Sequence, residues 1–329
     1  MDSLSQAALG ASVAGALAPA GHRGKAMLIG AGLGTLPDLD VFIDFGGAVE
    51  NYTYHRGFSH SLFVLAPFSA LLWLLLRRWW APVREDPLRW LAAISLALLT
   101  HPLLDAHTAY GTQLFWPLTV PPTSWATLFI IDPLYTLPLL VGVLLAAFRR
   151  KAGGMALRVG LAISTLYVGW SWMAQATVSR NVEDTLASMQ LEDAPVFLTP
   201  TPLNTLLWRV VVLTDGGYLE GFDSLMIGEG TMRFTAYPSA VDAMEDAGDV
   251  WAVNRLRWFA RDFVKARIDK DRLVISDLRM GQEPTYAFNH VVAARGNPHW
   301  NAIPAERLPM SLGDRALART WDRIWSDLD

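Results

Sequence analysis

The sequence predicts an α-helical integral membrane domain of about five or six helices, followed by a soluble α+β domain. Of the 329 residues, 52% are hydrophobic and only 18% are charged, whereas the surface of a soluble domain of this length has to carry more charge. Residues 1–176 hold this apolar excess, with charges clustered between long uncharged runs, and from residue 177 onward acids and bases are mixed. We therefore expect a membrane domain over 1–176 and a soluble domain over 177–329, each with its own core.

Six segments are candidate membrane helices, namely residues 4–18, 26–45, 61–76, 88–104, 126–148 and 155–176. A helix that crosses a bilayer needs about 20 mostly apolar residues. The last two segments have that length, and the middle two reach it only if their polar ends enter the interface. The first pair is less regular, because small residues fill the first segment and a proline with three aspartates interrupts the second.

Gly30, Gly32 and Gly34 are spaced like part of a nucleotide-binding loop. The full glycine fingerprint is missing, and no strand pattern precedes these residues. Small residues in a membrane segment let helices approach closely. We therefore interpret the three glycines as a helix-packing feature.

The basic residues predict the orientation of the membrane helices. Clusters within residues 22–25, 77–84 and 149–158 fall in alternate loops, whereas loops 46–59 and 106–125 contain one basic residue, Arg56. Loops rich in Lys and Arg stay in the cytoplasm. We therefore expect a multi-pass protein of the cytoplasmic (inner) membrane, whose acid- and His-bearing loops and soluble domain face outward, towards the periplasm in a Gram-negative cell.

The soluble part has the pattern of a mixed α+β domain. Four β-rich segments are expected at 206–213, 232–237, 272–275 and 286–293, and two helices at 250–268 and 311–325. The periodicity of apolar residues supports these assignments. We predict that this domain folds separately and supplies no metal ligand.

Net charge and cysteine content limit the chemistry. A net charge of -4 argues against a nucleic-acid partner, which requires a basic face. The chain has no cysteine, so disulfides and thiolate metal sites are excluded. Any metal must be held by nitrogen and oxygen ligands.

Three short motifs carry His and Asp at the outer ends of predicted membrane helices. They are Pro-Asp-Leu-Asp at 37–40, His-Arg-Gly-Phe-Ser-His-Ser at 55–61, and His-Pro-Leu-Leu-Asp-Ala-His at 101–107. The orientation follows from the Lys and Arg clusters alone, so the common placement of the three motifs is an independent observation. Ionisable groups at membrane depth are costly and usually functional, so the convergence of these motifs predicts one site.

The spacing within these motifs suits a metal ion. His101 and Asp105 are four residues apart and share a helix face, while His55 and His60 flank a glycine-containing loop. With Asp38 they give a predicted ligand set of imidazoles and carboxylates, which suits Zn²⁺ or Mn²⁺. One or two divalent ions per chain are expected.

Further residues have two interpretations each. Asp40 is a bridging ligand or the general base, or it caps a helix together with Asp38. His107 is an additional ligand or a loop residue, and Asp132 is an additional ligand or a cap before Pro133. Arg56 stabilises charge on a phosphate or in the transition state, or it forms a salt bridge to a nearby Asp.

Read together, the motifs resemble the YdjM-like family of LexA-regulated, membrane-bound metal-dependent hydrolases. The resemblance includes residues 101–117, HPLLDAHTAYGTQLFWP, and continues into the tail through 201–212, TPLNTLLWRVVV, and 276–281, SDLRMG. Ser59 stands where this family has Thr as often as Ser. The resemblance implies a hydrolase with a bound metal, and it implies no substrate.

The residues are therefore interpreted as a metal-dependent hydrolase that uses a metal-activated water, since no Gly-x-Ser-x-Gly elbow is present. A site at the lipid–water boundary suits membrane lipids or an amphiphilic, lipid-linked substrate, and Arg56 favours a phosphoester. Two alternatives stay open. A metal-ion or proton transporter would place its polar groups near the bilayer midplane, and a non-catalytic scaffold would use the metal to hold helix ends together.

Overall fold

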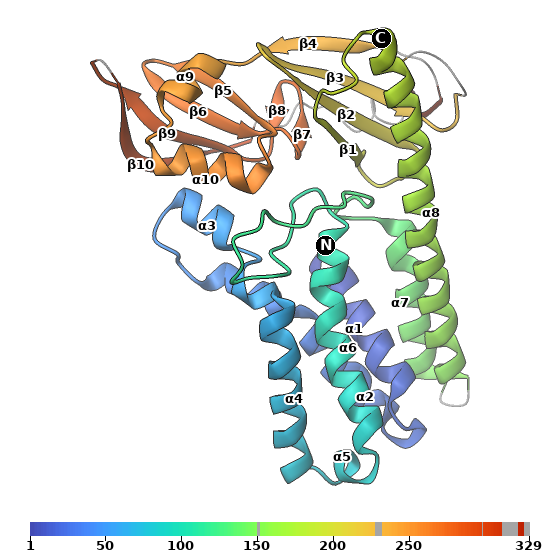
Figure 1. The fold of residues 1–329 in the computed structure, drawn as a ribbon. Coiled ribbons are helices and arrows are strands. Elements are labelled where there is room, and N and C mark those ends of the chain that lie inside the picture. The colour runs from blue at the N-terminus through green and yellow to red at the C-terminus, as the bar shows by residue number, and fades with distance from the viewer. Residues whose placement is uncertain (150–151, 228–231, 298, 311–321, 326–329) are drawn as a thin grey trace. The chain divides into compact units, whose positions relative to one another are not determined.

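The computed structural model describes the chain except for residues 150–151, 228–231, 298, 311–321 and 326–329 (Figure 1). The chain forms two compact units. The first comprises Met1–Ile43 and Arg56–Ser171, and the second comprises Asp44–His55 and Trp172–Asp329. The first unit is helical and the second is rich in strands. Arg150 and Lys151, and most of the helix expected at 311–325, lie outside the described residues.

The helices of the first unit are α1 (Ser3–Leu17), α2 (Arg23–Thr35), α4 (Leu62–Trp79), α5 (Ala81–Glu85), α6 (Pro87–Ala106), α7 (Pro133–Phe148) and the first part of α8 (Gly153–Ser188). Three short 3₁₀ turns connect them: η1 (Ala20–His22), η2 (Pro37–Phe42) and η3 (Phe58–His60). Helix α6 packs against α1, α2 and α4 (Figure 1). The expected domain boundary after residue 176 falls inside α8, which continues without a break.

Two helices of the described chain, α4 and α6, are long and apolar enough to cross a membrane. In α4 only 11% of the apolar window is buried, whereas the core helix of a soluble protein would be mostly buried. Helix α7 is apolar but shorter. The structure therefore supports two of the five or six expected spans, and the higher number stays a prediction.

Helices α1 and α2 approach each other through glycine. A Cβ atom on Gly30 would lie 2.2 Å from the carbonyl oxygen of Gly10, and one on Gly34 would lie 2.5 Å from that of Gln6. A Cβ atom on Gly32 would meet nothing within 4 Å. The helix-packing interpretation therefore holds for Gly30 and Gly34 and not for Gly32.

Two antiparallel four-stranded sheets dominate the second unit. One has the order β1-β2-β3-β4 and the other β10-β9-β6-β5. The strands are β1 (Val196–Pro200), β2 (Leu207–Thr214), β3 (Gly217–Ser224), β4 (Phe234–Pro238), β5 (Val264–Asp269), β6 (Arg272–Asp277), β9 (Asn289–Arg295) and β10 (Trp300–Leu308), with a small β7 (Gly281–Gln282) and β8 (Thr285–Tyr286) pair. All four expected β-rich segments contain strands.

The second unit also contains helices α3 (Ala48–Tyr54), α9 (Val241–Asp246) and α10 (Trp251–Ala260). The helix expected over 250–268 was wrong in its second half. Arg261 and Asp262 have φ angles of 52° and 63°, which end α10, because left-handed residues cannot continue a right-handed helix. The buried side chains of Val264 and Ala266 then alternate with more exposed neighbours along strand β5.

Candidate metal centre

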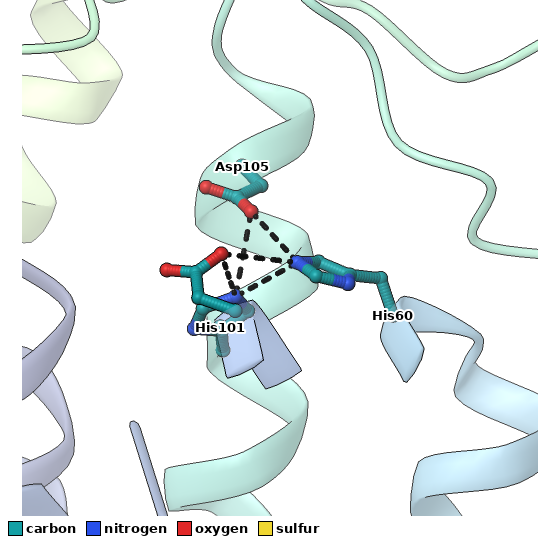
Figure 2. Close-up of side chains that lie close together, drawn as sticks. His60, His101 and Asp105 are labelled. Atoms are coloured by element: carbon teal, nitrogen blue, oxygen red, sulfur yellow. Dashed lines mark hydrogen bonds and ion pairs between the residues drawn. The ribbon is translucent and has the colours of Figure 1, made fainter. Parts of the chain in front are cut away.

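Four His and Asp side chains of the first unit converge on one point. Asp38 comes from η2. His60 comes from η3, and His101 and Asp105 come from α6 (Figure 2). Pro37 has no N–H with which to continue the α2 ladder, so the chain tightens into the 3₁₀ turn that carries Asp38. On α6, the spacing of four residues places His101 and Asp105 on one face.

The ligand atoms of these four residues lie at the separations of a compact coordination shell. The Nε2 atoms of His60 and His101 are 3.0 Å apart. Asp38 Oδ1 lies 3.4 Å and 3.5 Å from these two atoms, and Asp105 Oδ2 lies 3.3 Å and 3.4 Å from them. A tetrahedral ion with bonds of about 2.0–2.1 Å separates its ligand atoms by about 3.3 Å. The four atoms therefore fit around a single ion of this size.

The hydrogen bonds of the two imidazoles direct bare nitrogens towards this point. His101 Nδ1 lies 2.6 Å from the Gly34 carbonyl oxygen, so it carries the proton and donates it there. His60 Nδ1 lies 2.9 Å from Ser59 Oγ, whose own proton goes to Asp40 at 2.5 Å. When its ring is neutral, each imidazole in this arrangement would carry the lone pair on Nε2, as metal-binding histidines do.

Asp40 lies behind His60 and outside the group of four. Its Oδ2 accepts hydrogen bonds from the Arg56 backbone N–H at 3.0 Å and from Ser59 Oγ, and it is 3.7 Å from His60 Nδ1. The side chain is 1% exposed. The structure therefore places Asp40 where it can orient His60 and tie η2 to η3.

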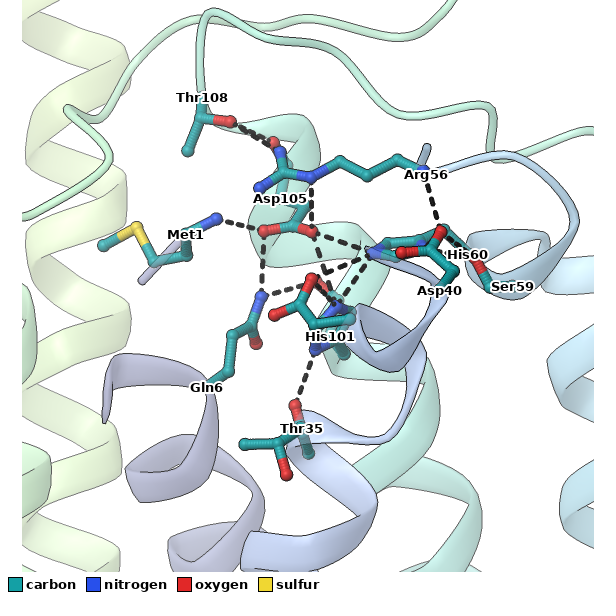
Figure 3. A network of polar contacts seen from close by, with 12 residues as sticks. Met1, Gln6, Thr35, Asp40, Arg56, Ser59, His60, His101, Asp105 and Thr108 are labelled. Atoms are coloured by element: carbon teal, nitrogen blue, oxygen red, sulfur yellow. Dashed lines mark hydrogen bonds and ion pairs between the residues drawn. The ribbon is translucent and has the colours of Figure 1, made fainter. Parts of the chain in front are cut away.

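Asp105 is surrounded by donors (Figure 3). Its Oδ1 accepts from Gln6 Nε2 at 2.9 Å and from the Met1 amino group, and Arg56 Nε lies 3.2 Å from Oδ2. Among the described residues, Oδ2 is buried and has no hydrogen bond. A buried carboxylate oxygen without a hydrogen bond is costly, and this one lies beside the Nε2 atoms of His60 and His101. A cation at this point would satisfy all three atoms.

Arg56 forms the salt bridge that was one of its two interpretations. Its guanidinium donates to Thr108 Oγ1 at 3.2 Å and lies over the Tyr110 ring, with 5.0 Å from Cζ to the ring centroid. The residue is 4% exposed. These contacts hold the charge of Arg56 beside Asp105.

Asp38 is the candidate ligand on the accessible side of the cluster. Its side chain is 21% exposed, whereas those of the other three ligands are fully buried. Burial by itself would raise the pKa of the Asp38 carboxyl, but contacts with the protonated imidazoles of His101 and His60 outweigh burial and lower the pKa. Asp38 is therefore ionised at neutral pH, as a metal ligand must be.

Comparison with known proteins agrees with the motifs. The model of the YdjM inner membrane protein family matches residues 1–178, which is more than half of the chain. The chain belongs to this family. The match contains all four residues of the cluster, and the motifs at 201–212 and 276–281 lie beyond its end.

One curated relative supports the membrane assignment. Inner membrane protein YbcI of Escherichia coli (strain K12) is 38% identical over 85 residues, which are 26% of this chain and 47% of that protein. The chain thus spans about half the length of this relative. No solved structure matches the chain. The YdjM family match makes this chain an inner membrane protein.

Three other predicted ligands lie outside the group of four. His55 ends α3 in the second unit. His107 follows α6, with its Nδ1 2.8 Å from Thr127 Oγ1 and its ring 4.8 Å from that of Trp125. Asp132 caps α7 by accepting from the N–H groups of Leu134 and Tyr135, and burial raises its pKa.

Some supporting residues were not predicted from the sequence. Gln6 contacts Asp105 and the His101 carbonyl oxygen, and the Gly34 carbonyl oxygen holds His101. A glutamine in an apolar segment is a signal that could have identified Gln6. A backbone carbonyl leaves no such signal in the sequence.

Proposed function

We propose that this YdjM family protein is a metal-dependent hydrolase that holds one divalent cation, Zn²⁺ or Mn²⁺. Asp38, His60, His101 and Asp105 would be its ligands. The observation that carries the proposal is the convergence of two imidazole Nε2 atoms and two carboxylate oxygens, of which Asp105 Oδ2 is buried without a hydrogen bond. A divalent ion bound there would lower the pKa of a coordinated water and supply hydroxide at neutral pH.

The protein's own side chains would prepare the site for this chemistry. Gly34 and Ser59 fix the ring orientations of His101 and His60. Arg56 balances the charge of Asp105 in a buried environment, where an unpaired carboxylate would be unstable. Asp40 serves as a positioning residue, because it contacts His60 and the Arg56 backbone rather than the point between the four ligand atoms.

An amphiphilic substrate is supported by the surface next to Asp38. Leu39, Val41 and Phe42 lie in the same 3₁₀ turn and are 53%, 65% and 83% exposed. Exposed apolar residues grouped in this way mark contact with a membrane or an apolar ligand. A lipid-linked substrate could bind its tail here and present its polar head, a phosphoester in our proposal, to the side of the site where Asp38 is accessible.

The membrane arrangement belongs to the same proposal. The apolar side chains Leu137, Val141 and Leu144 of α7, and Val159, Ile163 and Leu166 of α8, are all exposed. Exposed apolar rows on long helices are suited to lipid. Together with α1, α2, α4 and α6 they would give six membrane-embedded helices, with the metal centre on the periplasmic side as the distribution of basic residues predicts.

A metal-stabilised scaffold is the second candidate, and one observation favours it. Four protein ligands with three fully buried members resemble a closed structural site, whereas a catalytic site keeps one position open. In such a protein the cation would hold η2, η3 and α6 together, and no substrate would reach it.

Metal analysis combined with an activity screen separates these outcomes. The full chain would be purified in detergent, its metal content measured, and phosphoesters with lipid and soluble leaving groups offered with and without chelator. One ion per chain with chelator-sensitive turnover is expected. An ion without turnover of any ester would favour the scaffold, and absence of an ion after reconstitution would overturn both candidates.

A further inference from the structure

The segment between the first two ligand motifs belongs to the second unit. The chain leaves the first unit after Ile43, one residue beyond the end of η2, and returns to it at Arg56. Asp38 precedes this excursion and His60 follows it. The excursion itself, Asp44–His55, contains helix α3. The segment that sets the spacing of two metal ligands is therefore packed into a different unit.

Tyr52 is the main anchor of α3 in the second unit. Its hydroxyl donates to Asp277 Oδ2 at 2.7 Å. Its ring is stacked on Phe288 with 4.4 Å between centroids, and the rings of Phe259 and His290 lie at 4.9 Å and 5.1 Å. Because three rings pack against its ring and its hydroxyl is hydrogen-bonded, the Tyr52 side chain is held in a single conformation.

Asp277 is fixed in turn by Arg279. The Arg279 side chain donates to both carboxylate oxygens, at 3.0 Å to Oδ1 and 2.6 Å to Oδ2, and its backbone N–H donates to Oδ1 at 2.9 Å. Both residues are almost fully buried. They belong to the motif at 276–281, which the metal centre does not use, and anchoring α3 gives this motif a role.

A second anchor lies one residue further along α3. Thr53 is fully buried, and its Oγ1 accepts from Arg255 Nε at 2.9 Å while its carbonyl oxygen accepts from Arg255 Nη2 at 3.2 Å. The Arg255 guanidinium also lies over the rings of Tyr54 and Trp258, at 4.6 Å and 4.1 Å. Arg255 of α10, itself packed on Trp258, thus holds the end of α3 that leads to the His60 motif.

We infer that the second unit positions the metal centre by holding α3, with Tyr52 and Thr53 as positioning residues. The base of the excursion is closed by Asp40, which binds the Arg56 N–H and Ser59. Anchoring α3, in the middle of the excursion, reduces the number of conformations in which Asp38 and His60 lie far apart. A site that is assembled before the ion arrives binds it more tightly, because less ordering accompanies binding.

This inference rests on the metal centre proposed above, so its test measures cation binding and not turnover. Co²⁺ would be titrated into the full chain in detergent, and its visible absorption would report both affinity and coordination. Tyr52→Ala removes the anchor and should weaken Co²⁺ binding about tenfold or more, which is the range for residues that orient metal ligands. Tyr52→Phe keeps the ring and should lose no more than about fivefold, the loss from one hydrogen bond.

Tyr237→Ala is the matched control. Tyr237 is an aromatic residue of β4 that packs on Tyr218, 5.6 Å between centroids, in the other sheet of the same unit. It should leave Co²⁺ affinity unchanged. Arg255→Gln is a second test variant, which is used if Tyr52→Ala fails to fold, because Arg255 is only half-buried. It should weaken Co²⁺ binding severalfold.

The outcomes are distinct. Equal Co²⁺ affinity in the wild type, Tyr52→Ala and Arg255→Gln would overturn the positioning role and leave the metal centre intact. Equal weakening by Tyr237→Ala would also overturn it, because any loss of stability would then have the same effect. Absence of Co²⁺ binding by the wild type would refute the metal centre itself.

Discussion

His60 and His101 place their Nε2 atoms 3.0 Å apart, although 41 residues separate them in the chain. Their Nδ1 atoms face Ser59 Oγ and the Gly34 carbonyl oxygen, so two lone pairs meet at this point. Lone pairs so close repel each other unless a proton or a cation lies between them. The two Asp oxygens around the same point add negative charge, which favours a divalent cation.

The four ligands should act as one unit. His60→Ala, His101→Ala and Asp105→Ala should each abolish stoichiometric metal binding, and double variants should lose little more, because groups that act together are non-additive. Metal content and turnover of single and double variants test this. His299→Ala, an exposed histidine of the second unit, is the control. Mild, additive losses with metal retained would mean that these residues are separate helix caps.

Two glycines of one helix give a matched pair. Gly34→Ala would place a Cβ atom 2.5 Å from the Gln6 carbonyl oxygen, which pushes α1 from α2 and disturbs the carbonyl that orients His101. We expect lower stability and metal affinity reduced about tenfold or more. Gly32→Ala meets nothing within 4 Å and should be neutral or slightly stabilising, since Ala favours helix by about 1 kcal/mol. Metal titration and thermal unfolding of both variants decide the point. Equal behaviour would contradict the close packing.

Asp40→Asn tests whether Asp40 positions His60. The amide keeps one acceptor oxygen but loses the charge that binds Ser59 and the Arg56 N–H. Metal affinity should fall about tenfold to a hundredfold, and the stoichiometry at saturating metal should stay at wild-type level. Loss of the ion at saturation would instead identify Asp40 as a ligand. Competition with a chromogenic chelator measures the affinity.

The sequence predicted the grouping of His and Asp side chains better than the residues around it. The spacing of His101 and Asp105 places them on one helix face, so half of the cluster follows from local geometry. His55 and His60 looked equivalent in sequence, yet His55 ends a helix that packs in the second unit. Tyr52 and Thr53 of that helix make tertiary contacts with Asp277 and Arg255, and the local pattern contains no information about these contacts.

In the membrane region and in the second unit, too, the sequence predicted what local patterns determine and missed what depends on other features. Hydropathy identified α4 and α6, because each is long and apolar enough to cross a membrane. The helix expected over 250–268 continued too far, because the end of α10 depends on the left-handed Arg261, and Arg is not a residue that signals this conformation. The cap role of Asp132 was one of its two interpretations, and α7 shows it.

His290 should make the second unit sensitive to acid. It is 1% exposed, and burial, aided by the nearby Arg307, lowers its pKa from 6.5 to about 4. Between these values the unfolded chain binds a proton that the folded chain does not, so stability falls as the pH falls from about 7 towards 4. The single-site loss between pH 7 and 5 is about 2 kcal/mol. Hydrogen exchange of the amides in β6 and β9, corrected for the intrinsic pH dependence, measures it. His290→Gln should flatten this dependence and His299→Gln should not, and a wild-type slope in His290→Gln would show that another group is responsible.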